Sequence, residues 1–326
     1  MNSDSTALKG WTPSLSVVIP TYGRPELLDE AIDSVLVQGL ADVEVIVVDD
    51  HPTIPAERSS WCAAGDPRVR IMRSGPSAGG AWAKTAGART ARGQIVVFLD
   101  DDDTLFSGAC ARILEAFKAV PQVDLLYLDV ACFGERAVEF QAAIAAATEN
   151  LLSQHSVPSS LRDLLLLDRQ LPVSLFSRIP MPFQRFAVTT KGFAEVGGFR
   201  KDCLLWDNDW SIRASFALRT AFLRGSIYRW RVGVHNLFSK AGTGLAQAQS
   251  KISYLEWMHD HPRVRESRTL ARAVDRAISD ELYSLARWHL CEKRLLQGTS
   301  ALVASQRRAH VARRWLTLAR AFIPEG

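Results

Sequence analysis

Short apolar runs alternate with amphipathic stretches along residues 14–128. Two of the intervening stretches predict helices. One is opened by Pro25 and has apolar residues at helical spacing, and the other, residues 79–92, is opened by glycine and rich in Ala. The apolar runs are rich in Val, Ile and Leu and are bounded by polar residues, which is typical of buried strands. These runs are residues 15–19, 43–48, 69–72, 95–99 and 125–128. Strands that alternate with helices predict an α/β fold with a mostly parallel central sheet flanked by helices.

The pattern changes after residue 128. Ala and Leu dominate residues 133–177, and Pro158 and Pro172 interrupt them, which predicts a helical insertion over about 134–177. Residues 178–243 are irregular and rich in Gly, Arg and aromatic residues, as loops that face a ligand often are. Later residues predict helices, including one over 301–323 that places four apolar side chains on one face: Val311, Trp315, Leu318 and Phe322. The expected parts are therefore 14–128, 129–245 and a helical C-terminal extension, 246–326.

Charge is distributed unevenly over the 326 residues, whose formal net charge is +4. Residues 263–326 contain 13 Lys/Arg and 6 Asp/Glu, a net +7, which leaves −3 for the first 262 residues. Nucleic-acid binding is therefore not expected of the chain as a whole. For the basic C-terminal helices we favour packing against the rest of the chain or a homodimer partner. Peripheral contact with an anionic membrane is the alternative.

Cysteine use and hydropathy indicate the compartment. The five cysteines are scattered, odd in number and without a CxxC pair, which favours reduced thiols over a zinc site or a disulfide framework. The first nine residues lack the apolar core of a signal peptide, and no apolar run reaches the roughly 18 residues that span a bilayer. We expect a cytoplasmic protein, at most peripheral at the inner membrane face.

Four consecutive carboxylates, Asp100 to Asp103, follow the apolar run 95–99. The carboxyl end of a central strand is where open α/β sheets bind their ligands. Carboxylate oxygens suit Mg²⁺ or Mn²⁺, and such an ion can carry a diphosphate. A solvated acidic turn is the weaker reading, because the strand places the acids at a ligand-binding edge.

Four segments of the chain, in their order and spacing, resemble those of inverting family 2 glycosyltransferases with the GT-A fold. The resemblance covers Ser14 to Ser239 and rests on four segments in order. They are SVVIPTYGRPELLDEAIDSVL, VEVIVVDD, the Gly-Ala-Arg-rich segment before the fourth run, and IVVFLDDDD. The resemblance implies a nucleotide-diphosphate sugar donor, with a UDP-sugar favoured, and a divalent metal, Mg²⁺ or Mn²⁺. The implied acceptor is a carbohydrate, a lipid-linked molecule or a small molecule.

The resemblance also implies roles for individual residues on the donor side. It assigns the donor's nucleoside to four residues near the ends of the first two strands: Pro20, Thr21, Tyr22 and Asp50. Tyr22 offers a flat apolar face for a base, although ordinary core packing is the alternative. The family's Asp-x-Asp-Asp pattern falls on Asp100, Asp102 and Asp103. It makes Asp102 and Asp103 the contacts to metal and sugar nucleotide and Asp101 the variable position.

Two further residues join the donor side through the resemblance. Lys84 stands where relatives carry arginine, so a phosphate or nucleoside contact is expected, without the two-pronged geometry of a guanidinium. His235 precedes Ser239, as in relatives where a histidine before a serine-containing loop helps to hold the metal or diphosphate. A packed or exposed structural histidine is the alternative.

The general base is expected after the Val196-Gly197-Gly198-Phe199 segment, which resembles the GGF segment of relatives. Anchoring the pattern on Arg213 places the catalytic carboxylate at Asp207 and puts Trp206 where glutamate is commoner. A flanking Trp can desolvate Asp207 and raise its proton affinity, which suits a general base. Asp209 is the alternative base, and a helix N-cap is the structural alternative for either residue.

The predicted function is therefore a metal-dependent inverting transfer of a sugar to an acceptor hydroxyl, with Asp207 as the base. A nucleotidyltransferase-like enzyme is one rival, but Tyr22-Gly23-Arg24-Pro25 is a poor match to the Gly-rich, basic segment it would need. A non-catalytic sugar-nucleotide or lipid-surface binding protein is the other rival.

Overall fold

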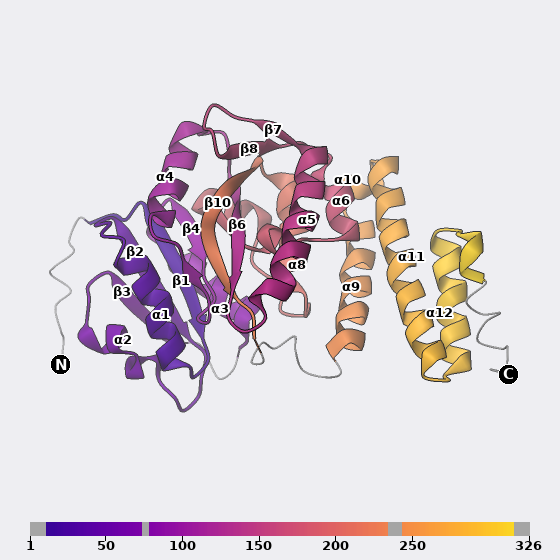
Figure 1. Cartoon of the computed structure of the whole chain (residues 1–326), viewed down its shortest axis with the longest axis horizontal. Helices are drawn as coiled ribbons and strands as arrows, with labels where there is room; N and C mark the ends of the chain where they lie inside the picture. Colours follow the sequence, from indigo (N-terminus) through magenta and orange to yellow (C-terminus); the bar gives the residue numbers. More distant parts are fainter. Residues whose placement is uncertain (1–10, 74–77, 234–242, 316–326) are drawn as a thin grey trace. The chain divides into compact units, whose positions relative to one another are not determined.

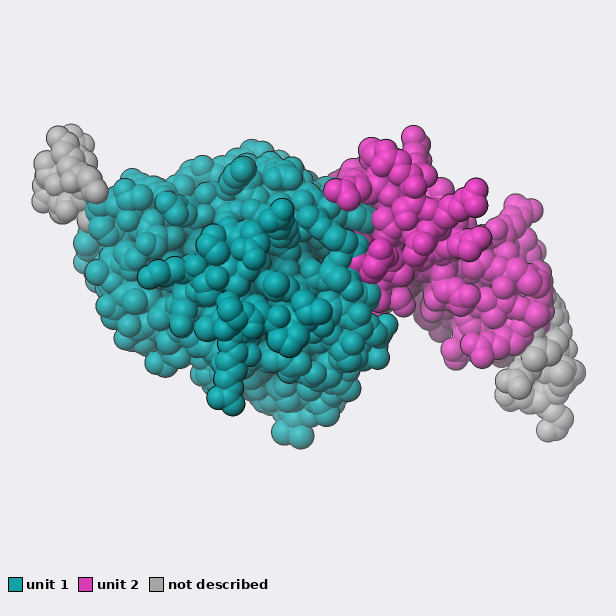
Figure 2. Space-filling view, turned by 90° about the horizontal axis from the view of Figure 1, so that it is seen from above, with its two compact units in different colours: residues 1–169, 180–201, 206–234 teal, residues 170–179, 202–205, 235–326 magenta. Residues whose placement is uncertain are grey.

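The computed structural model describes residues 11–73, 78–233 and 243–315 (Figure 1). The chain divides into two units, which Figure 2 colours separately. Unit 1 consists of residues 1–169, 180–201 and 206–234, and unit 2 of residues 170–179, 202–205 and 235–326.

Unit 1 is built on one β-sheet. The strand order is β3-β2-β1-β4-β9-β6-β10-β8-β7, and β5 pairs with β10 outside this path. The strands are β1 Leu15–Thr21, β2 Val43–Asp49, β3 Val69–Arg73, β4 Ile95–Phe98, β5 Thr104–Leu105, β6 Leu125–Phe133, β7 Ser156–Pro158, β8 Leu164–Leu167, β9 Phe186–Thr189 and β10 Thr220–Arg231. Strands β1, β2, β3, β4, β6, β7 and β10 run in one direction, and β5, β8 and β9 run in the opposite direction. The predicted mostly parallel sheet is confirmed.

Helices cover both faces of this sheet. The helical elements of unit 1 are α1 Pro25–Leu36, η1 Ala56–Arg58, α2 Ser60–Ala64, α3 Gly80–Thr90, α4 Ala109–Ala119, α5 Ala137–His155, η2 Met181–Gln184, α7 Thr190–Val196 and α8 Trp206–Ala217. Alternate β1 residues point to opposite faces, so Val17 and Ile19 join one core with α1 and α4. Val18 faces α3, where a Cβ on Gly87 would lie 2.5 Å from its Cγ1. Gly87 therefore lets α3 lie close against the sheet.

A second contact joins α3 to the segment that precedes α8. The Phe199 backbone N–H donates to Thr85 Oγ1 over 3.0 Å. A Cβ on Gly198 would lie 2.5 Å from Thr85 Cγ2, so the backbone approaches α3 only because residue 198 is glycine. Phe199 then packs edge to face on Phe98 of β4, with ring centroids 5.2 Å apart. These contacts fix the start of α8 relative to the first half of the sheet.

The predicted insertion over 134–177 is only partly helical. Helix α5 is present, but β7 and β8 form a hairpin where the sequence predicts helix. The Leu164–Leu167 run pairs antiparallel with β10, for example Leu164 with Leu223. A four-residue apolar run does not distinguish a helix from a strand, and here a neighbouring strand decides.

Unit 2 is helical over the residues that the structure describes. Its elements are α6 Leu171–Ser177, α9 Thr243–His259, α10 Pro262–Arg265, α11 Arg268–Cys291, α12 Leu295–Arg308 and η4 Ala312–Arg314. Helix α11 contacts α6, α9, α10 and α12. No helix in the described part of the chain has both the length and the apolar composition needed to cross a bilayer.

The C-terminal part of unit 2 corrects one expectation. The predicted helix over 301–323 ends at Arg308, and Ala309 is extended. Arg314 is buried instead, and its Nη1 donates to the Ser279 carbonyl oxygen over 3.1 Å and to Ser305 Oγ over 2.8 Å. This buried guanidinium ties the segment to α11 and α12, which explains why the helix does not continue. Leu318 and Phe322 lie outside the described residues.

Candidate active site

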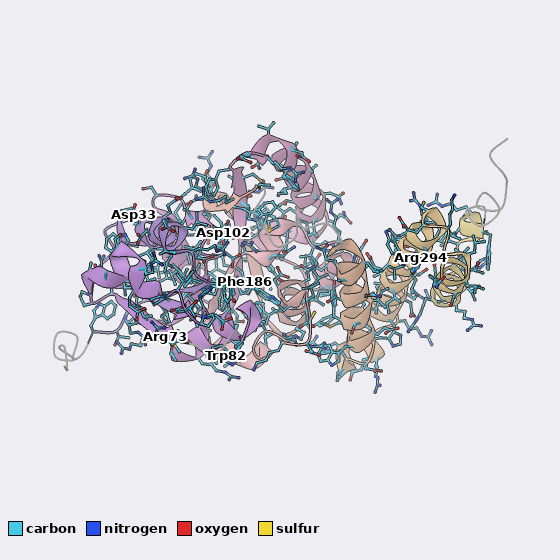
Figure 3. The ribbon with its side chains drawn as sticks, turned by 90° about the horizontal axis from the view of Figure 1, so that it is seen from below. Asp33, Arg73, Trp82, Asp102, Phe186 and Arg294 are labelled. Atoms are coloured by element: carbon cyan, nitrogen blue, oxygen red, sulfur yellow. The ribbon has the colours of Figure 1, made fainter. Side chains whose placement is uncertain are left out.

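The four consecutive carboxylates lie in the loop after β4, at the carboxyl end of the sheet (Asp102 is labelled in Figure 3). Cations from three other segments approach them: Arg24 at the start of α1, Lys84 in α3 and Arg185 before β9. The carboxylates differ in their partners, and these differences define what each can do.

Asp101 is held at the end of β1. Its Oδ2 accepts from Thr21 Oγ1 over 2.7 Å and from Arg24 Nε over 3.2 Å, and Arg24 Nη2 contacts Oδ1. Its side chain is 1% exposed. Burial raises the pKa of Asp101 to about 6, although Arg24 and Thr21 oppose the rise. Asp101, the variable position of the family pattern, thus links the loop to β1.

Asp103 is held by β10 and is also 1% exposed. Tyr228 Oη donates to its Oδ2 over 2.8 Å, and the Arg231 backbone N–H donates to its Oδ1 over 2.8 Å. Arg185 Nη2 lies 3.6 Å from Oδ2. Burial raises the pKa of this carboxyl, so the site favours a neutral or hydrogen-bonded Asp103. Both of its oxygens already have protein partners.

Asp100 bridges two cations. Lys84 Nζ lies 2.5 Å from its Oδ1, and Arg185 Nη2 lies 3.1 Å from its Oδ2. Burial acts to raise the pKa of Asp100, but Lys84 and Arg185 outweigh it and lower the pKa. Lys84 also lies 4.9 Å from the centre of the Trp206 ring. Asp100 is therefore ionised and joins α3 to the segment before β9.

Asp102 has fewer protein partners than its neighbours. Its side chain is 21% exposed, and Oδ2 accepts from Arg24 Nη1 over 2.9 Å. Its backbone oxygen accepts from Arg231 Nε over 2.7 Å, which fixes the peptide. No described residue bonds to Oδ1. Of the two carboxylates predicted to contact the metal, Asp102 is the one with an oxygen available to a ligand.

The predicted nucleoside residues cluster at the ends of β1 and β2. Tyr22 is 51% exposed, and its ring meets His51 edge to face, with centroids 4.5 Å apart. Asp50 is buried and accepts from the backbone N–H groups of Ala78 and Gly79 over 2.8 and 2.7 Å. Asp50 therefore positions the loop that leads into α3, while Tyr22 keeps an open surface. Pro20 lies within β1.

The two candidate bases lie in the first turn of α8 and differ in surroundings. Asp209 is 0% exposed, Arg213 Nε donates to its Oδ2 over 2.9 Å, and Arg200 Nη1 lies 3.6 Å from Oδ1. Asp207 is partly buried, and its Oδ1 accepts from the adjacent Asn208 backbone N–H over 2.8 Å. Burial raises the pKa of Asp207, although Arg185 and Lys84 act to lower it. The ring centre of the adjacent Trp206 lies 4.9 Å from Lys84 Nζ, which pairs with Asp100, so this turn of α8 lies on the side of the carboxylates after β4.

Arg185 is the site residue that sequence reasoning missed. It is 8% exposed and contacts Asp100 and Asp103, and its charge also acts on Asp207. Burial acts to lower its pKa, but the neighbouring acids outweigh burial and raise it. Its Nε is buried without a hydrogen-bond partner in the structure. In the sequence, Arg185 stands directly before the apolar strand Phe186–Thr189. An arginine in such a position is commonly solvated, so the sequence gives little indication that Arg185 is buried.

The carboxylate oxygens after β4 suit a metal ion that arrives bound to a diphosphate. They suit less well a metal ion held by protein side chains alone. Among the described residues, no three Asp, Glu, His or Cys side chains come together as metal ligands. Mg²⁺ is commonly bound through one or two carboxylates together with substrate phosphates and water. Asp102 Oδ1 fits that role. His235 and Ser239 lie outside the described residues.

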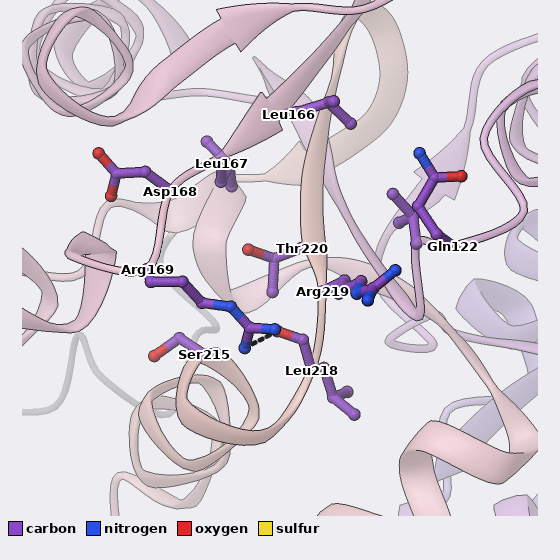
Figure 4. A pocket seen from close by; sticks show the side chains of 10 residues that line it. Gln122, Leu166, Leu167, Asp168, Arg169, Ser215, Leu218, Arg219 and Thr220 are labelled. Carbon is purple, nitrogen blue, oxygen red and sulfur yellow. Dashed lines mark hydrogen bonds between the residues drawn. The ribbon is translucent and has the colours of Figure 1, made fainter. Parts of the chain in front are cut away.

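A separate cavity of about 200 Å³ lies where β6 and β10 begin, at the end of the sheet opposite the carboxylate loop (Figure 4). Residues before β6, at the end of β8 and at the start of β10 line it, including Gln122, Leu166 and Thr220. Arg169 Nη1 donates to the Leu218 carbonyl oxygen there over 3.5 Å, the dashed line in Figure 4. The carboxylates follow the carboxyl end of β4, whereas the cavity lies at the amino ends of β6 and β10. The cavity is therefore not part of the carboxylate site.

Comparison with known sequences shows which protein family the first half of the chain is similar to. Residues 16–159 match the model of the family described as Glycosyl transferase family 2. GalNAc(5)-diNAcBac-PP-undecaprenol beta-1,3-glucosyltransferase of Campylobacter jejuni is 35% identical over 109 residues, covering 32% of this chain and 34% of that protein. Succinoglycan biosynthesis protein ExoO of Rhizobium meliloti is 34% identical over 123 residues, covering 36% and 35%. The chain thus spans about a third of the length of these relatives.

Comparison with solved structures concerns the fold. S. aureus TarS in complex with UDP-GlcNAc has a TM-score of 0.55 at 15% identity, over 90% of this chain and 91% of that chain. Mannosyltransferase PcManGT from Pyrobaculum calidifontis, in complex with GDP-Man and Mn²⁺, has a TM-score of 0.54 at 18% identity, over 95% and 80%. The predicted GT-A fold is confirmed.

Proposed function

Residues 16–159 belong to glycosyltransferase family 2, and from this premise we propose that the chain transfers a sugar from a nucleotide-diphosphate donor to an acceptor hydroxyl with inversion. One observation carries the proposal. The ring centre of Trp206 lies 4.9 Å from Lys84 Nζ, which pairs with Asp100, so the adjacent Asp207, a partly buried carboxylate, lies on the side of the strand-end carboxylates. Together these provide a proton acceptor and a diphosphate site on one edge of the sheet.

The donor's nucleoside is held at the ends of β1 and β2. Tyr22 presents a ring face to the base, and we assign Asp50, which also accepts from two backbone N–H groups, to a base N–H or ribose hydroxyl. We favour a UDP-sugar. TarS was crystallised with UDP-GlcNAc and PcManGT with GDP-Man, so uridine and guanosine donors both belong in the test.

The acceptor hydroxyl loses its proton to Asp207. Burial favours the protonated form of this carboxyl and so increases its affinity for the proton it removes. The oxygen then attacks the anomeric carbon in line, so an α-linked donor gives a β-linked product. Asp209 holds Arg213 and keeps the first turn of α8 in place.

Lys84 and Arg185 act on the diphosphate side. Both are buried and form ion pairs with Asp100, so these cationic side chains oppose the negative charge that grows on the leaving diphosphate. A divalent ion, Mg²⁺ or Mn²⁺, supplies Lewis-acid stabilisation of that leaving group when it is bound. Asp102 is the protein ligand we assign to it, whereas Asp103 positions the loop through Tyr228 and Arg231.

A donor screen tests this function. Thermal unfolding is measured with Mn²⁺ and each of a set of UDP- and GDP-sugars, because a bound ligand raises the unfolding temperature by mass action. Hydrolysis or transfer of the stabilising donor is then measured with Mn²⁺ and with EDTA. Stabilisation without any turnover would favour the non-catalytic binding protein. Conversion of the donor to a nucleoside triphosphate and a sugar 1-phosphate, only when pyrophosphate is added, would favour a nucleotidyltransferase.

The nucleoside site has its own test. Asp50→Ala removes the acceptor of two backbone N–H groups and a partner for the base. It should weaken donor binding by roughly 1.5 to 3 kcal/mol, which is about ten- to a hundredfold in Kd. Calorimetry measures the Kd, and circular dichroism checks the fold. An unchanged Kd would remove Asp50 from the site.

A further inference from the structure

The turn between α11 and α12 exposes apolar side chains that the transfer reaction does not use. Residues 291–297 are all exposed, with Leu296 85% and Leu295 40% exposed. Trp288, in the last turn of α11, is 38% exposed. Trp288 and residues 291–297 are called the tip below. In contrast, Leu290 and Gly298, which flank residues 291–297, are buried.

Backbone geometry holds the tip in a defined shape. Lys293 has φ 57°, and no other non-glycine residue in the described ranges has a positive φ. The Arg294 N–H donates to the His289 carbonyl oxygen over 2.8 Å, and the Lys293 N–H donates to that of Leu290 over 3.0 Å. This is the Schellman arrangement that ends a helix, in which glycine is usual at the left-handed position. A Cβ on Gly298 would lie 2.6 Å from Leu290 Cγ, so α12 returns in close contact with α11.

Cationic side chains surround the exposed leucines. Arg287, Lys293 and Arg294 are exposed, and none of them has an acidic partner among the residues that the structure describes. The guanidinium carbon of Arg294 lies 5.1 Å from the centre of the Trp288 ring (Arg294 is labelled in Figure 3). Glu292 is the only acid within residues 287–297, so this segment carries a net +2.

We propose that the tip inserts into the headgroup region of an anionic lipid bilayer. Exposed leucines supply apolar contact with the acyl boundary, a Trp suits the interface, and neighbouring Lys and Arg residues attract anionic headgroups. A protein partner fits less well, because a stable interface buries about 800 Å² on each side and the tip is one short convex turn. The proposal concerns unit 2 alone and stands whether or not the transfer reaction is as proposed.

Vesicle co-sedimentation of the full chain tests the proposal. Vesicles of phosphatidylcholine mixed with phosphatidylglycerol are compared with vesicles of phosphatidylcholine alone, without any donor present. The chain should sediment with the mixed vesicles and not with the neutral ones. Leu296→Asp should weaken binding by at least about tenfold, because it places a charge at the inserting position. Arg294→Glu should weaken it by about tenfold, and added salt should weaken it further.

Matched controls separate the tip from the rest of the surface. Val138→Asp changes an apolar side chain that is 91% exposed on α5, and Arg268→Glu reverses a charge at the other end of α11. Both should bind vesicles like the unchanged protein. Lys293→Gly removes a charge and relieves the left-handed backbone position, so vesicle binding should fall about fivefold while the unfolding temperature rises or stays the same. A folding defect cannot produce that combination.

Three outcomes would overturn the proposal. One is that the unchanged chain does not bind the mixed vesicles. Another is that Val138→Asp or Arg268→Glu weakens binding as much as the tip variants do. The third is a dimer in analytical ultracentrifugation that Leu296→Asp converts to a monomer, which would make the tip a surface for self-association.

Discussion

The loop after β4 and the first turn of α8 both place a buried carboxylate next to one with fewer protein partners. In the loop, Asp101 and Asp103 are almost fully buried while Asp102 keeps an oxygen without a described partner. In the helix, Asp209 is fully buried against Arg213, while the Asp207 side chain accepts a hydrogen bond from the backbone N–H of its neighbour Asn208. The loop is held by cations from several elements, whereas the helix supplies Arg213 itself, four residues on. A carboxylate's partners, and not its place in an acidic run, indicate whether it holds the fold or meets a ligand.

The largest expected effect tests this contrast in α8. Asp207→Asn keeps the shape but removes the proton acceptor, so turnover should fall by roughly 10²- to 10⁴-fold with little change in donor Kd. Asp209→Asn leaves Arg213 without its charged partner and should lower the free energy of unfolding by about 3 kcal/mol. Turnover per folded molecule and urea unfolding measure the two effects. If Asp209→Asn silenced the folded enzyme while Asp207→Asn remained active, the two roles would be exchanged.

A smaller effect tests the same contrast in the loop. Asp102→Asn should reduce Mn²⁺-dependent turnover by about a hundredfold and weaken Mn²⁺ binding in the presence of nucleoside diphosphate, because it removes the assigned ligand. EDTA should abolish the activity of the unchanged enzyme. Asp103→Asn should bind Mn²⁺ normally, since its site already favours a neutral side chain. Full activity in EDTA would exclude the metal role, and loss of Mn²⁺ binding in Asp103→Asn alone would move the ligand to Asp103.

The smallest effect links the two regions through charge. Burial raises the pKa of Asp207, so the acidic limb of the kcat/KM profile should lie above the ordinary carboxyl range near pH 4, with activity rising as Asp207 loses its proton. Lys84 acts to lower that pKa, so Lys84→Met should move the limb to higher pH. Lys191→Met, an exposed change on α7, should leave the limb in place. A limb that moved to lower pH would contradict the assignment of Asp207 as the base.

The sequence predicts the sheet well because β1, β2 and β4 are short apolar runs buried on both faces. β1, β2 and β3 begin at the predicted residues, and α1 spans Pro25–Leu36 as expected. The β7–β8 hairpin could not be predicted, because the Leu164–Leu167 run is a strand only through its pairing with β10. The end of α12 was missed for a similar reason, since buried contacts of Arg314 replace further helix.

The site residues could be predicted where a sequence motif coincides with the end of a strand. They were harder to predict where the residue that contacts them is distant in the sequence. Asp100 to Asp103 follow a buried strand, so their location could be inferred from local pattern alone. Arg185 lies more than 80 residues from the carboxylates it contacts, and a lone arginine carries no indication of burial. The different environments of Asp207 and Asp209 likewise depend on Arg200 and on the segment that precedes α8.

The contact between Thr85 and Gly198 has a consequence for recombination. Thr85 belongs to the half of the chain that resembles many sugar transferases, and Gly198 leads into the half that carries Asp207. A chimera that joins the first half of one relative to the second half of another keeps its two halves in register only if this pair is transplanted together. A bulkier residue at 198 would push the start of α8 away from α3, so a transplanted second half would need glycine at this position.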